Sequence, residues 1–288
     1  MQEKFAVFTM DVETFADTEC IANSSEDVQV DLMDGFDEYI SLLDKYGIKG
    51  TLFTVGSLAP KIASKLKKCI KNGHRLALHS YEHIAPMDVS TDTFKREISK
   101  AKEHLSNLFG TEVMGFRAPF FSMDNSRLSI LKELGFRYDS SHLDFPKARH
   151  TVELDLNDFA PLSKDIFQNG DFFEFGMPKQ KILGQEFPIS GGGYVRLNPW
   201  RVIKSVIKQY VKNNNYYVFY LHPFELTRQK IPFVKDLKPH DRYYIKHGIS
   251  EYKKHIEQII LMLKKEGYKF ITFEELTESL SKEGVKAK

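Results

Sequence analysis

Short apolar runs alternate with longer amphipathic segments along most of the chain. A short run that is apolar throughout is typical of a parallel strand buried on both faces, and apolar residues at every third or fourth position indicate a helix. The pattern predicts strands at 5–10, 51–55, 75–78, 113–117, 136–139, 187–190, 216–221 and 269–272. It predicts helices at 34–46, 57–72, 90–109, 124–134, 198–212 and 250–266.

Five times a helical pattern ends in a glycine and runs within a few residues into an apolar stretch. Glycine adopts the left-handed conformation past a helix end without a steric clash of Cβ. Helices and strands that alternate in this way predict βα units and therefore a parallel sheet or barrel. The five junctions are at Gly47, Gly73, Gly110, Gly135 and Gly267.

The helical rhythm stops between about 142 and 190, which predicts an insert of short strands and loops. The three glycines that follow, 191–193, lack the spacing of a phosphate-binding loop and predict a tight turn. The next helix is expected to begin with Asn198 as its N-cap and Pro199 at its first helical position.

Composition narrows the class of protein. The 288 residues include 41 Lys and Arg against 39 Asp and Glu, a net charge of +2. A near-neutral chain is not expected to need nucleic acid as a partner. No stretch approaches the 18 apolar residues of a membrane span, and the apolar run after the N-terminus is too short for a signal-peptide core. We therefore expect a cytoplasmic protein, with Cys20 and Cys69 both reduced.

Ionisable side chains follow most of the predicted strands. In βα barrels the side chains that perform chemistry gather at the carboxyl ends of the strands. The sequence therefore predicts one polar site at the mouth of the barrel, formed by Asp11, Glu13, His79, His83, Arg117, Asp139 and His222.

Two histidines and a carboxylate in this group form a possible metal site. His79 and His83 are four residues apart, which would place both imidazoles on one side of a helical turn. Such a pair is more often two surface histidines, but Glu13 is predicted at the same end of the barrel. Two histidines and one carboxylate with an open position suit a hydrolytic zinc site or a facial iron site. Asp11 and Glu13 point the same way on an extended chain, so one can bind metal while the other acts as a base.

Five motifs carry a resemblance to a known family. The segments TMDVE (9–13), LHSYEH (78–83), GFRAPFFS (115–122), FRYDSS (136–141) and FYLHP (219–223) resemble, in this order, those of the polysaccharide deacetylase family, which is the NodB-homology domain of carbohydrate esterase family four. With the segments GGGYVRLNP and LHPFE, the chain is most similar to deacetylases of bacterial exopolysaccharide biosynthesis clusters. The resemblance implies a single domain over residues 1–288, a distorted (β/α) barrel of about seven strands with the irregular insert near 142–190.

The resemblance also implies roles on the metal-binding side of the site. Asp11 matches the catalytic base, and His79 and His83 match the metal-binding pair. In the family the metal-binding acid usually follows the base directly, but Val12 occupies that position here. Glu13, one residue further on, is therefore the expected third ligand of one divalent metal ion, Zn²⁺ or alternatively Co²⁺ or Fe²⁺.

Further roles are implied for the rest of the motifs. Arg117 matches the residue that orients the base, and the backbone N–H of Phe120 matches a donor to the oxyanion. His222 matches the general acid, and Asp139 the carboxylate that tunes it. Apart from the resemblance, Tyr194 and Arg196 follow the glycines 191–193 at the predicted barrel mouth, and from this position we expect this segment to line the substrate groove.

These features predict a metal-dependent hydrolase that removes an acetyl or other acyl group from an N-acylated sugar or oligosaccharide. A first alternative is a hydrolase of the same fold that acts on a linear or cyclic C–N bond outside sugars. A second is a carbohydrate-binding relative without catalysis, for which Val12 speaks and the retained Asp11, His79, His83, Arg117 and His222 do not. The sequence carries no signal of oligomeric state.

Overall fold

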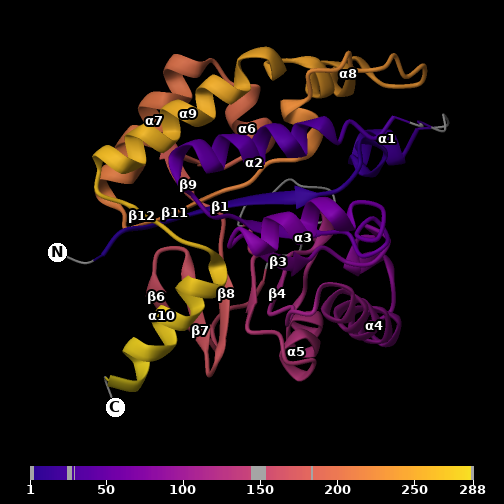
Figure 1. Ribbon diagram of the computed structural model, residues 1–288. Helices are drawn as coiled ribbons and strands as arrows, with labels where there is room; N and C mark the ends of the chain where they lie inside the picture. Colours follow the sequence, from indigo (N-terminus) through magenta and orange to yellow (C-terminus); the bar gives the residue numbers. More distant parts are fainter. Residues whose placement is uncertain (1–2, 25–27, 29, 144–153, 183, 287–288) are drawn as a thin grey trace.

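A curled sheet of parallel strands lies at the centre of the α/β fold (Figure 1). The computed structural model describes residues 3–24, 28, 30–143, 154–182 and 184–286. Its sheet runs β11 (Tyr216–Phe219), β1 (Phe5–Val12), β2 (Thr51–Thr54), β3 (Arg75–Leu78), β4 (Gly115–Phe116), β5 (Tyr138–Asp139) and β8 (Phe172–Phe175), all parallel. These seven strands make the distorted, open barrel that the sequence predicts.

Antiparallel strands extend the sheet beyond β8. β7 (Ile166–Asn169) and β6 (Ala160–Ser163) follow β8, and β12 (Lys269–Phe270) pairs with the start of β1. β9 (Lys179–Ile182) and β10 (Gln185–Pro188) form a separate two-stranded sheet. The described part of the predicted insert thus contains short strands, and residues 144–153 and 183 of it lie outside the described residues.

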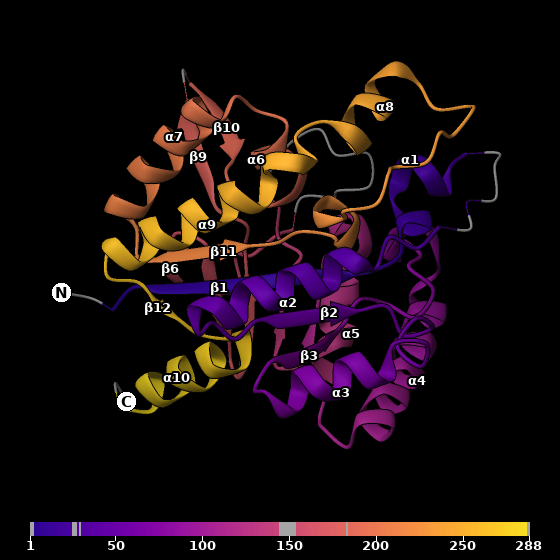
Figure 2. The same cartoon turned by 45° about the horizontal axis from the view of Figure 1, so that its top comes forward.

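Helices cover the outer face of the curled sheet (Figures 1 and 2). The long ones are α2 (Asp34–Tyr46), α3 (Ala63–Lys71), α4 (Thr91–Phe109), α5 (Asn125–Glu133), α7 (Trp200–Asn213) and α9 (Ile249–Lys265). A further long helix, α10 (Phe273–Lys286), packs on the inner face, where Phe273 and Leu276 share a cluster with Val7 and Phe53. Short helices are α1 (Glu19–Ala22), α6 (Gly192–Arg196) and α8 (Pro239–Lys246), with 3₁₀ turns η1 (Phe15–Asp17), η2 (Pro86–Asp88), η3 (Pro119–Phe121) and η4 (Pro223–Leu226). No helix within the described ranges is both long and apolar enough to cross a membrane.

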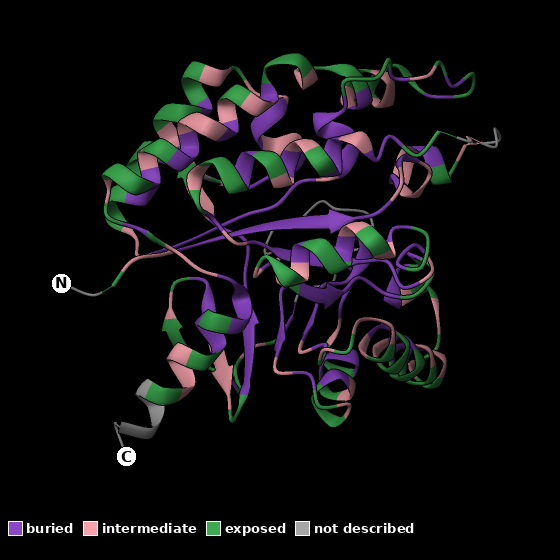
Figure 3. Ribbon diagram, viewed as in Figure 1, coloured by how far each residue is buried: buried purple, intermediate pink, exposed green. Residues whose placement is uncertain are grey.

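The alternation of side chains along β1 separates the core from the site. Phe8, Met10 and Val12 belong to the large hydrophobic cluster that the helices cover. The intervening side chains of Thr9 and Asp11 are buried among polar groups on the other face of the strand. Figure 3 shows that the central parallel strands are buried, whereas β6 and β7 at the edge of the sheet and the outer faces of the helices are exposed or half-buried.

The glycine junctions are confirmed, whereas several boundaries differ from prediction. All five junction glycines have φ between 63° and 94°. The strand expected at 187–190 overlaps β10, which lies outside the main sheet, and β8, which was not predicted, pairs with β5. The helix expected at 57–72 begins only at Ala63. Asn198 is not the cap of the following helix, because its side chain donates to the carbonyl of Tyr194 and Pro199 occupies the N-cap.

Candidate active site

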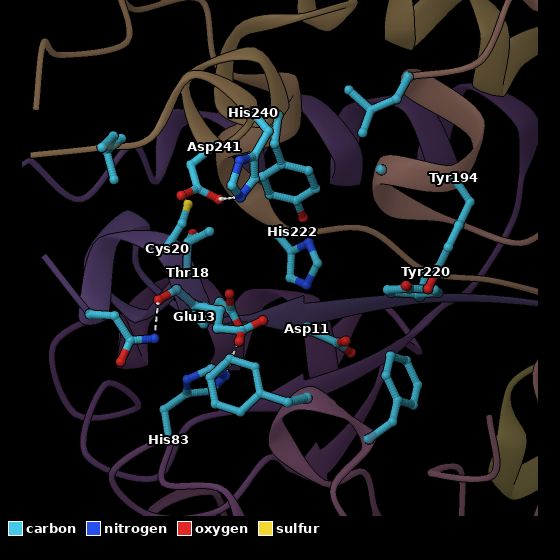
Figure 4. A pocket seen from close by; sticks show the side chains of 18 of the residues that line it. Asp11, Glu13, Thr18, Cys20, His83, Tyr194, Tyr220, His222, His240 and Asp241 are labelled. Carbon is cyan, nitrogen blue, oxygen red and sulfur yellow. Dashed lines mark hydrogen bonds and ion pairs between the residues drawn. The ribbon is translucent and has the colours of Figure 1, made fainter. Parts of the chain in front are cut away.

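The carboxyl ends of the parallel strands open on a cavity of about 1070 Å³ (Figure 4). Asp11 and Glu13 enter it from the end of β1, His79 and His83 from the loop after β3, and His222 from the loop after β11. Strands far apart in sequence therefore bring together the ionisable residues that the sequence places at their ends. Phe120 and Tyr194 also line the cavity, and Arg117 is fully buried beside Asp11.

Glu13, His79 and His83 form a buried cluster with the chemistry of a metal site. Their ligand atoms all lie within 4.8 Å of one another. Glu13 Oε2 lies 2.7 Å from His83 Nε2 and 3.6 Å from His79 Nε2. Such separations suit two imidazoles and a carboxylate that share one ion at bond lengths of about 2.0–2.2 Å. The residues present therefore fit a single divalent cation.

A carbonyl group fixes the tautomer of His79. Its Nδ1 lies 2.7 Å from the backbone oxygen of Arg117. A carbonyl oxygen can only accept, so Nδ1 carries the proton and Nε2 presents its lone pair to the cluster. This arrangement prepares His79 as a ligand through Nε2.

The loop after β3 brings the two histidines together in a way that the sequence did not predict. Ser80 and His83 both have positive φ, 58° and 56°, so residues 79–83 form a tight loop and not a helical turn. The imidazole centroids of His79 and His83 nevertheless lie 5.1 Å apart. Left-handed backbone in two non-glycine residues is costly, and such conformations concentrate at functional sites.

Glu13 is the negative centre of this cluster. Burial alone would raise the pKa of its carboxyl, but the positive charges of His83 and His222 and a hydrogen bond from His83 hold it well below the ordinary range. Burial would likewise lower the pKa of His83, but the charge of Glu13 and the hydrogen bond to it outweigh burial, so the pKa of His83 is raised. Val12 lies in the hydrophobic core on the helix side of β1, so Glu13 is the acid that reaches the histidines.

Arg117 holds Asp11 in place. Its Nη1 donates to Asp11 Oδ1 at 2.7 Å and to Thr9 Oγ1 at 2.9 Å. Its Nε and Nη2 bind the carbonyl and hydroxyl of Ser140, and the guanidinium lies 4.1 Å from the ring centroid of Phe53. With every side of the guanidinium engaged, the Asp11 carboxylate has a fixed, charged partner and a fixed orientation.

His222 is held by a carboxylate that sequence analysis did not select. Its Nδ1 lies 3.2 Å from Glu225 Oε2, and its backbone N–H donates to the same oxygen. The other oxygen, Oε1, accepts from Arg196 Nε at 2.9 Å. Arg196 in turn donates to the carbonyl oxygens of Tyr244 and His247.

This pairing changes the acidity of His222. Burial would lower the pKa of its imidazole, but the charges of Glu13 and Glu225 and the hydrogen bond to Glu225 raise it to about 9. The pKa of Glu225 is lowered: burial opposes this, but Arg196 and His222 outweigh it. The three-residue spacing in LHPFE, with proline at the first position of a turn, is the sequence signal that could have found Glu225.

Asp139, expected to tune His222, makes its hydrogen bonds elsewhere. It accepts from the backbone N–H and the hydroxyl of Ser141, whose Oγ also accepts from the N–H of Ala118. Burial raises the pKa of Asp139 to about 6 and that of the adjacent Glu174 well above its ordinary value. Two carboxyls that resist ionisation together form a proton-sharing pair, which supports the backbone before Phe120 rather than the imidazole of His222.

Phe120 and the glycines 191–193 shape the cavity wall. Phe120 has φ 57°, and its ring meets the edge of His83 at a centroid distance of 4.9 Å. The glycines begin the short helix α6, which carries Tyr194, and do not form the expected tight turn. At Gly191 (φ 69°) an added Cβ would lie 2.2 Å from the carbonyl oxygen of Tyr220. Glycine is thus required where α6 meets β11.

The remaining wall comes from two segments that sequence analysis did not assign to the site. One runs from Thr18 through Cys20 to the residues after α1, and the other from Asp236 to Tyr244 around α8. Figure 4 shows Cys20 facing Asp241 across this part of the cavity. Burial, followed by the charge of Asp241, raises the pKa of the Cys20 thiol to about 12, so this thiol stays protonated at neutral pH.

Two family models match consecutive parts of the chain. Residues 21–138 match polysaccharide deacetylase, and residues 153–278 match a domain of unknown function (DUF3473). The second region contains Tyr194, Arg196, His222 and Glu225. It therefore contributes one side of the same cavity and, through β8, β11 and β12, part of the same sheet.

Curated relatives match less than half of the chain. A peptidoglycan deacetylase of Helicobacter pylori is 27% identical over 113 residues, 38% of this chain and 39% of the relative. A chitooligosaccharide deacetylase of Azorhizobium caulinodans is 23% identical over 135 residues, 45% of this chain and 64% of the relative. The chain thus covers less than two thirds of the length of these relatives.

Solved structures resemble the fold over almost the full chain. A putative polysaccharide deacetylase from Mycobacterium smegmatis has a TM-score of 0.62 at 16% identity, and the match covers 98% of this chain and 92% of that one. A family 4 carbohydrate esterase pseudoenzyme from Bacillus anthracis has a TM-score of 0.55 at 13% identity, over 96% of this chain and 66% of that one. At such identities the likeness concerns the fold alone.

Proposed function

Because the chain belongs to the polysaccharide deacetylase family of the NodB-homology type, we propose that it is a metal-dependent hydrolase that removes the acetyl group from an N-acetylated sugar or oligosaccharide. One observation carries the proposal. The cavity holds a two-histidine, one-glutamate cluster between a carboxylate fixed by Arg117 and an imidazole fixed by Glu225. A protein that only binds sugars has no need for this set of groups.

Glu13, His79 and His83 would hold one divalent cation, with Zn²⁺ the best match to the donor set. A cation bound there would supply a Lewis acid that polarises the amide carbonyl and lowers the pKa of the attacking water. His79 is prepared for this by the carbonyl of Arg117, and Glu13 by its position between the two imidazoles.

Asp11 serves as the general base in this proposal. Its carboxylate takes the proton of the attacking water while Arg117 keeps it oriented toward the cavity. The backbone N–H of Phe120 is proposed as a donor to the oxygen on which negative charge develops. Its place beside His83 in the cavity wall supports that role.

His222 serves as the general acid. An amine leaves the tetrahedral carbon only if its nitrogen receives a proton, so the acid must be charged before the bond breaks. Glu225 is not one of the proposed metal ligands, so its carboxylate remains available to favour the protonated imidazole. Tyr194, on α6, lines the same cavity and is proposed as a contact for the sugar.

The test is release of acetate by the zinc-loaded protein. N-acetylated chitooligosaccharides and peptidoglycan fragments are the substrates, cyclic amides are the comparison, and Asp11→Asn is the inactive control. We expect acetate from at least one acetylated sugar, and a loss of about 10²- to 10⁴-fold in Asp11→Asn with metal content unchanged. Turnover of cyclic amides alone would reject the sugar assignment, and an Asp11→Asn variant as active as wild type would reject the base.

A further inference from the structure

The segment from Arg228 to His247, which includes α8, is strongly basic and lies next to the cavity mouth; we call it the basic rim. It holds six Lys and Arg residues against two acids, a net charge of +4 in a chain whose total is +2. Several of its residues line the cavity, from Asp236 to Tyr244. Figures 1 and 2 show α8 and the loop before it projecting from the body at the end where α1 lies.

The basic rim presents an aromatic side chain to solvent. Phe233 is 69% exposed, more than any other large hydrophobic side chain in the described part of the chain. The Arg242 guanidinium lies 4.4 Å from its ring centroid and is itself bound to the carbonyls of Lys235 and Leu237. Tyr243, on α8, is 51% exposed. Phe233 is thus held outward by an ordered contact, and its ring has no polar group of its own to hydrogen-bond with water.

A basic groove of about 590 Å³ lies on the same segment, beside the start of α9. It is lined by Arg228, Lys230, Lys246 and Lys253 together with Glu38. Arg228 and Lys253 both pair with Glu38, at 2.7 and 2.8 Å. Lys230 and Lys246 form no ion pair with any acid among the residues the structure describes, which leaves the groove positively charged.

We propose that the basic rim docks the protein on a lipid bilayer with anionic headgroups, with Phe233 inserted between headgroups and the lysines of the groove against lipid phosphates. Aromatic and basic side chains in one exposed segment are the combination that binds anionic membrane surfaces. Phe233 and Tyr243 lie outside the lining of the cavity, so they are not placed to stack on a sugar bound there. Insertion between headgroups would remove the exposed apolar ring of Phe233 from water, which a hydrated acidic polysaccharide on the same surface does to a smaller extent.

Docking through this surface would bring the cavity mouth close to the membrane. If the proposed deacetylase function holds, the substrate within reach would be an acetylated sugar carried on a lipid. Membrane binding itself does not depend on that function.

The experiment is co-sedimentation of the full chain with vesicles of phosphatidylcholine alone or mixed with phosphatidylglycerol, at low and high salt. We expect binding to the mixed vesicles only, and release by high salt. Lys230→Gln/Lys246→Gln should weaken binding about 25-fold, which is about fivefold for each charge removed. Phe233→Ser should weaken it about fivefold or more. Val202→Ser is the matched control, since Val202 on α7 is 59% exposed and lies outside the rim.

Two results would overturn the proposal. One is wild-type protein that stays in the supernatant with mixed vesicles at low salt. The other combines two observations. A soluble acidic polysaccharide binds wild type and Phe233→Ser equally, and wild type and Phe233→Ser each bind vesicles with and without phosphatidylglycerol to the same extent. That result would assign the rim to a polymer. Acetate release from soluble substrates should be unchanged in all these variants. That readout separates a failure of docking from a failure of the proposed deacetylase function.

Discussion

Replacing Glu225 by Gln should separate the chemistry of His222 from the fold that supports it. The side chain is fully buried and has one oxygen toward Arg196 Nε and the other toward His222 Nδ1. Glutamine keeps the shape but removes the charge, so the imidazolium loses the carboxylate to which it is hydrogen-bonded. Arg196 keeps its bonds to the carbonyls of Tyr244 and His247. Loss of a buried counter-charge should cost about 3 kcal/mol of unfolding free energy.

The assay compares two acetyl compounds that differ in their need for an acid. An acetamide must have its leaving amine protonated, whereas an activated aryl acetate expels a phenolate without help. We expect Glu225→Gln to lower kcat on the acetylated sugar about 100-fold, or ~3 kcal/mol in the barrier, and to leave the aryl ester within a few-fold. The ratio of the two rates is therefore the measured quantity, with metal content checked in parallel.

Glu274→Gln is the matched control for a buried glutamate. Glu274 binds the hydroxyl of Tyr138 at 2.8 Å and does not line the cavity, so its variant should leave the amide-to-ester ratio unchanged. Asp139→Asn should also leave the ratio unchanged, since Asp139 bonds to Ser141. If Glu225→Gln lowers both rates by the same factor, Glu225 serves the fold alone and the reasoning about His222 is wrong.

Three further predictions concern the metal, the buried acids and the packing behind the site. The His79→Ala/His83→Ala variant should bind no zinc by elemental analysis where wild type binds about one ion per chain, and retained zinc would reject the cluster as the site. Because burial raises the pKa values of Asp139 (to about 6) and Glu174, the native state binds these protons more tightly than the unfolded chain. Their contribution to the free energy of unfolding is full below about pH 4 and is lost as pH rises through 6 and beyond. Glu174→Gln should therefore reduce the fall in unfolding free energy between pH 5 and 8, measured by urea unfolding. The same fall in wild type and variant would contradict this. Gly35→Ala should destabilise by about 3 kcal/mol in thermal or urea unfolding, because its Cβ would lie 1.7 Å from a carbonyl oxygen of η4, and an unchanged stability would show that α2 and η4 move apart freely.

The order of strands and helices is encoded locally and could be predicted from the sequence. Apolar runs mark the parallel strands, and the glycine after each of five helices has the positive φ that its position requires. The polar residues that end the strands were predicted to share one mouth, since parallel strands point their carboxyl ends the same way. Asp11, Glu13 and His222 do line one cavity. Predicted helix boundaries were wrong where consecutive turns take the place of the first helical residues, as in the segment before Ala63.

Partners of the functional side chains depend on contacts between distant segments. The conformation of the loop that joins His79 to His83 depends on two left-handed residues that no local propensity favours. Arg196 reaches Glu225 only because α6 packs beside η4, across 29 positions of sequence. Asp139 ends its strand as predicted, but the packing of β8 next to β5 gives it Glu174 as a neighbour instead of His222.

Hydrophobic periodicity encodes which residues are buried and which end a strand, because these properties depend on neighbours along the chain. Which charges face each other depends on the register and packing of whole elements. The electrostatic energy of these pairs therefore exists only in the folded chain. For this protein the sequence therefore encodes the catalytic candidates and their side of the sheet. The contact of Arg117 with Asp11 is the one that the family resemblance implied. The tertiary structure alone decides that Glu225 holds His222 and that the basic rim lies next to the cavity mouth.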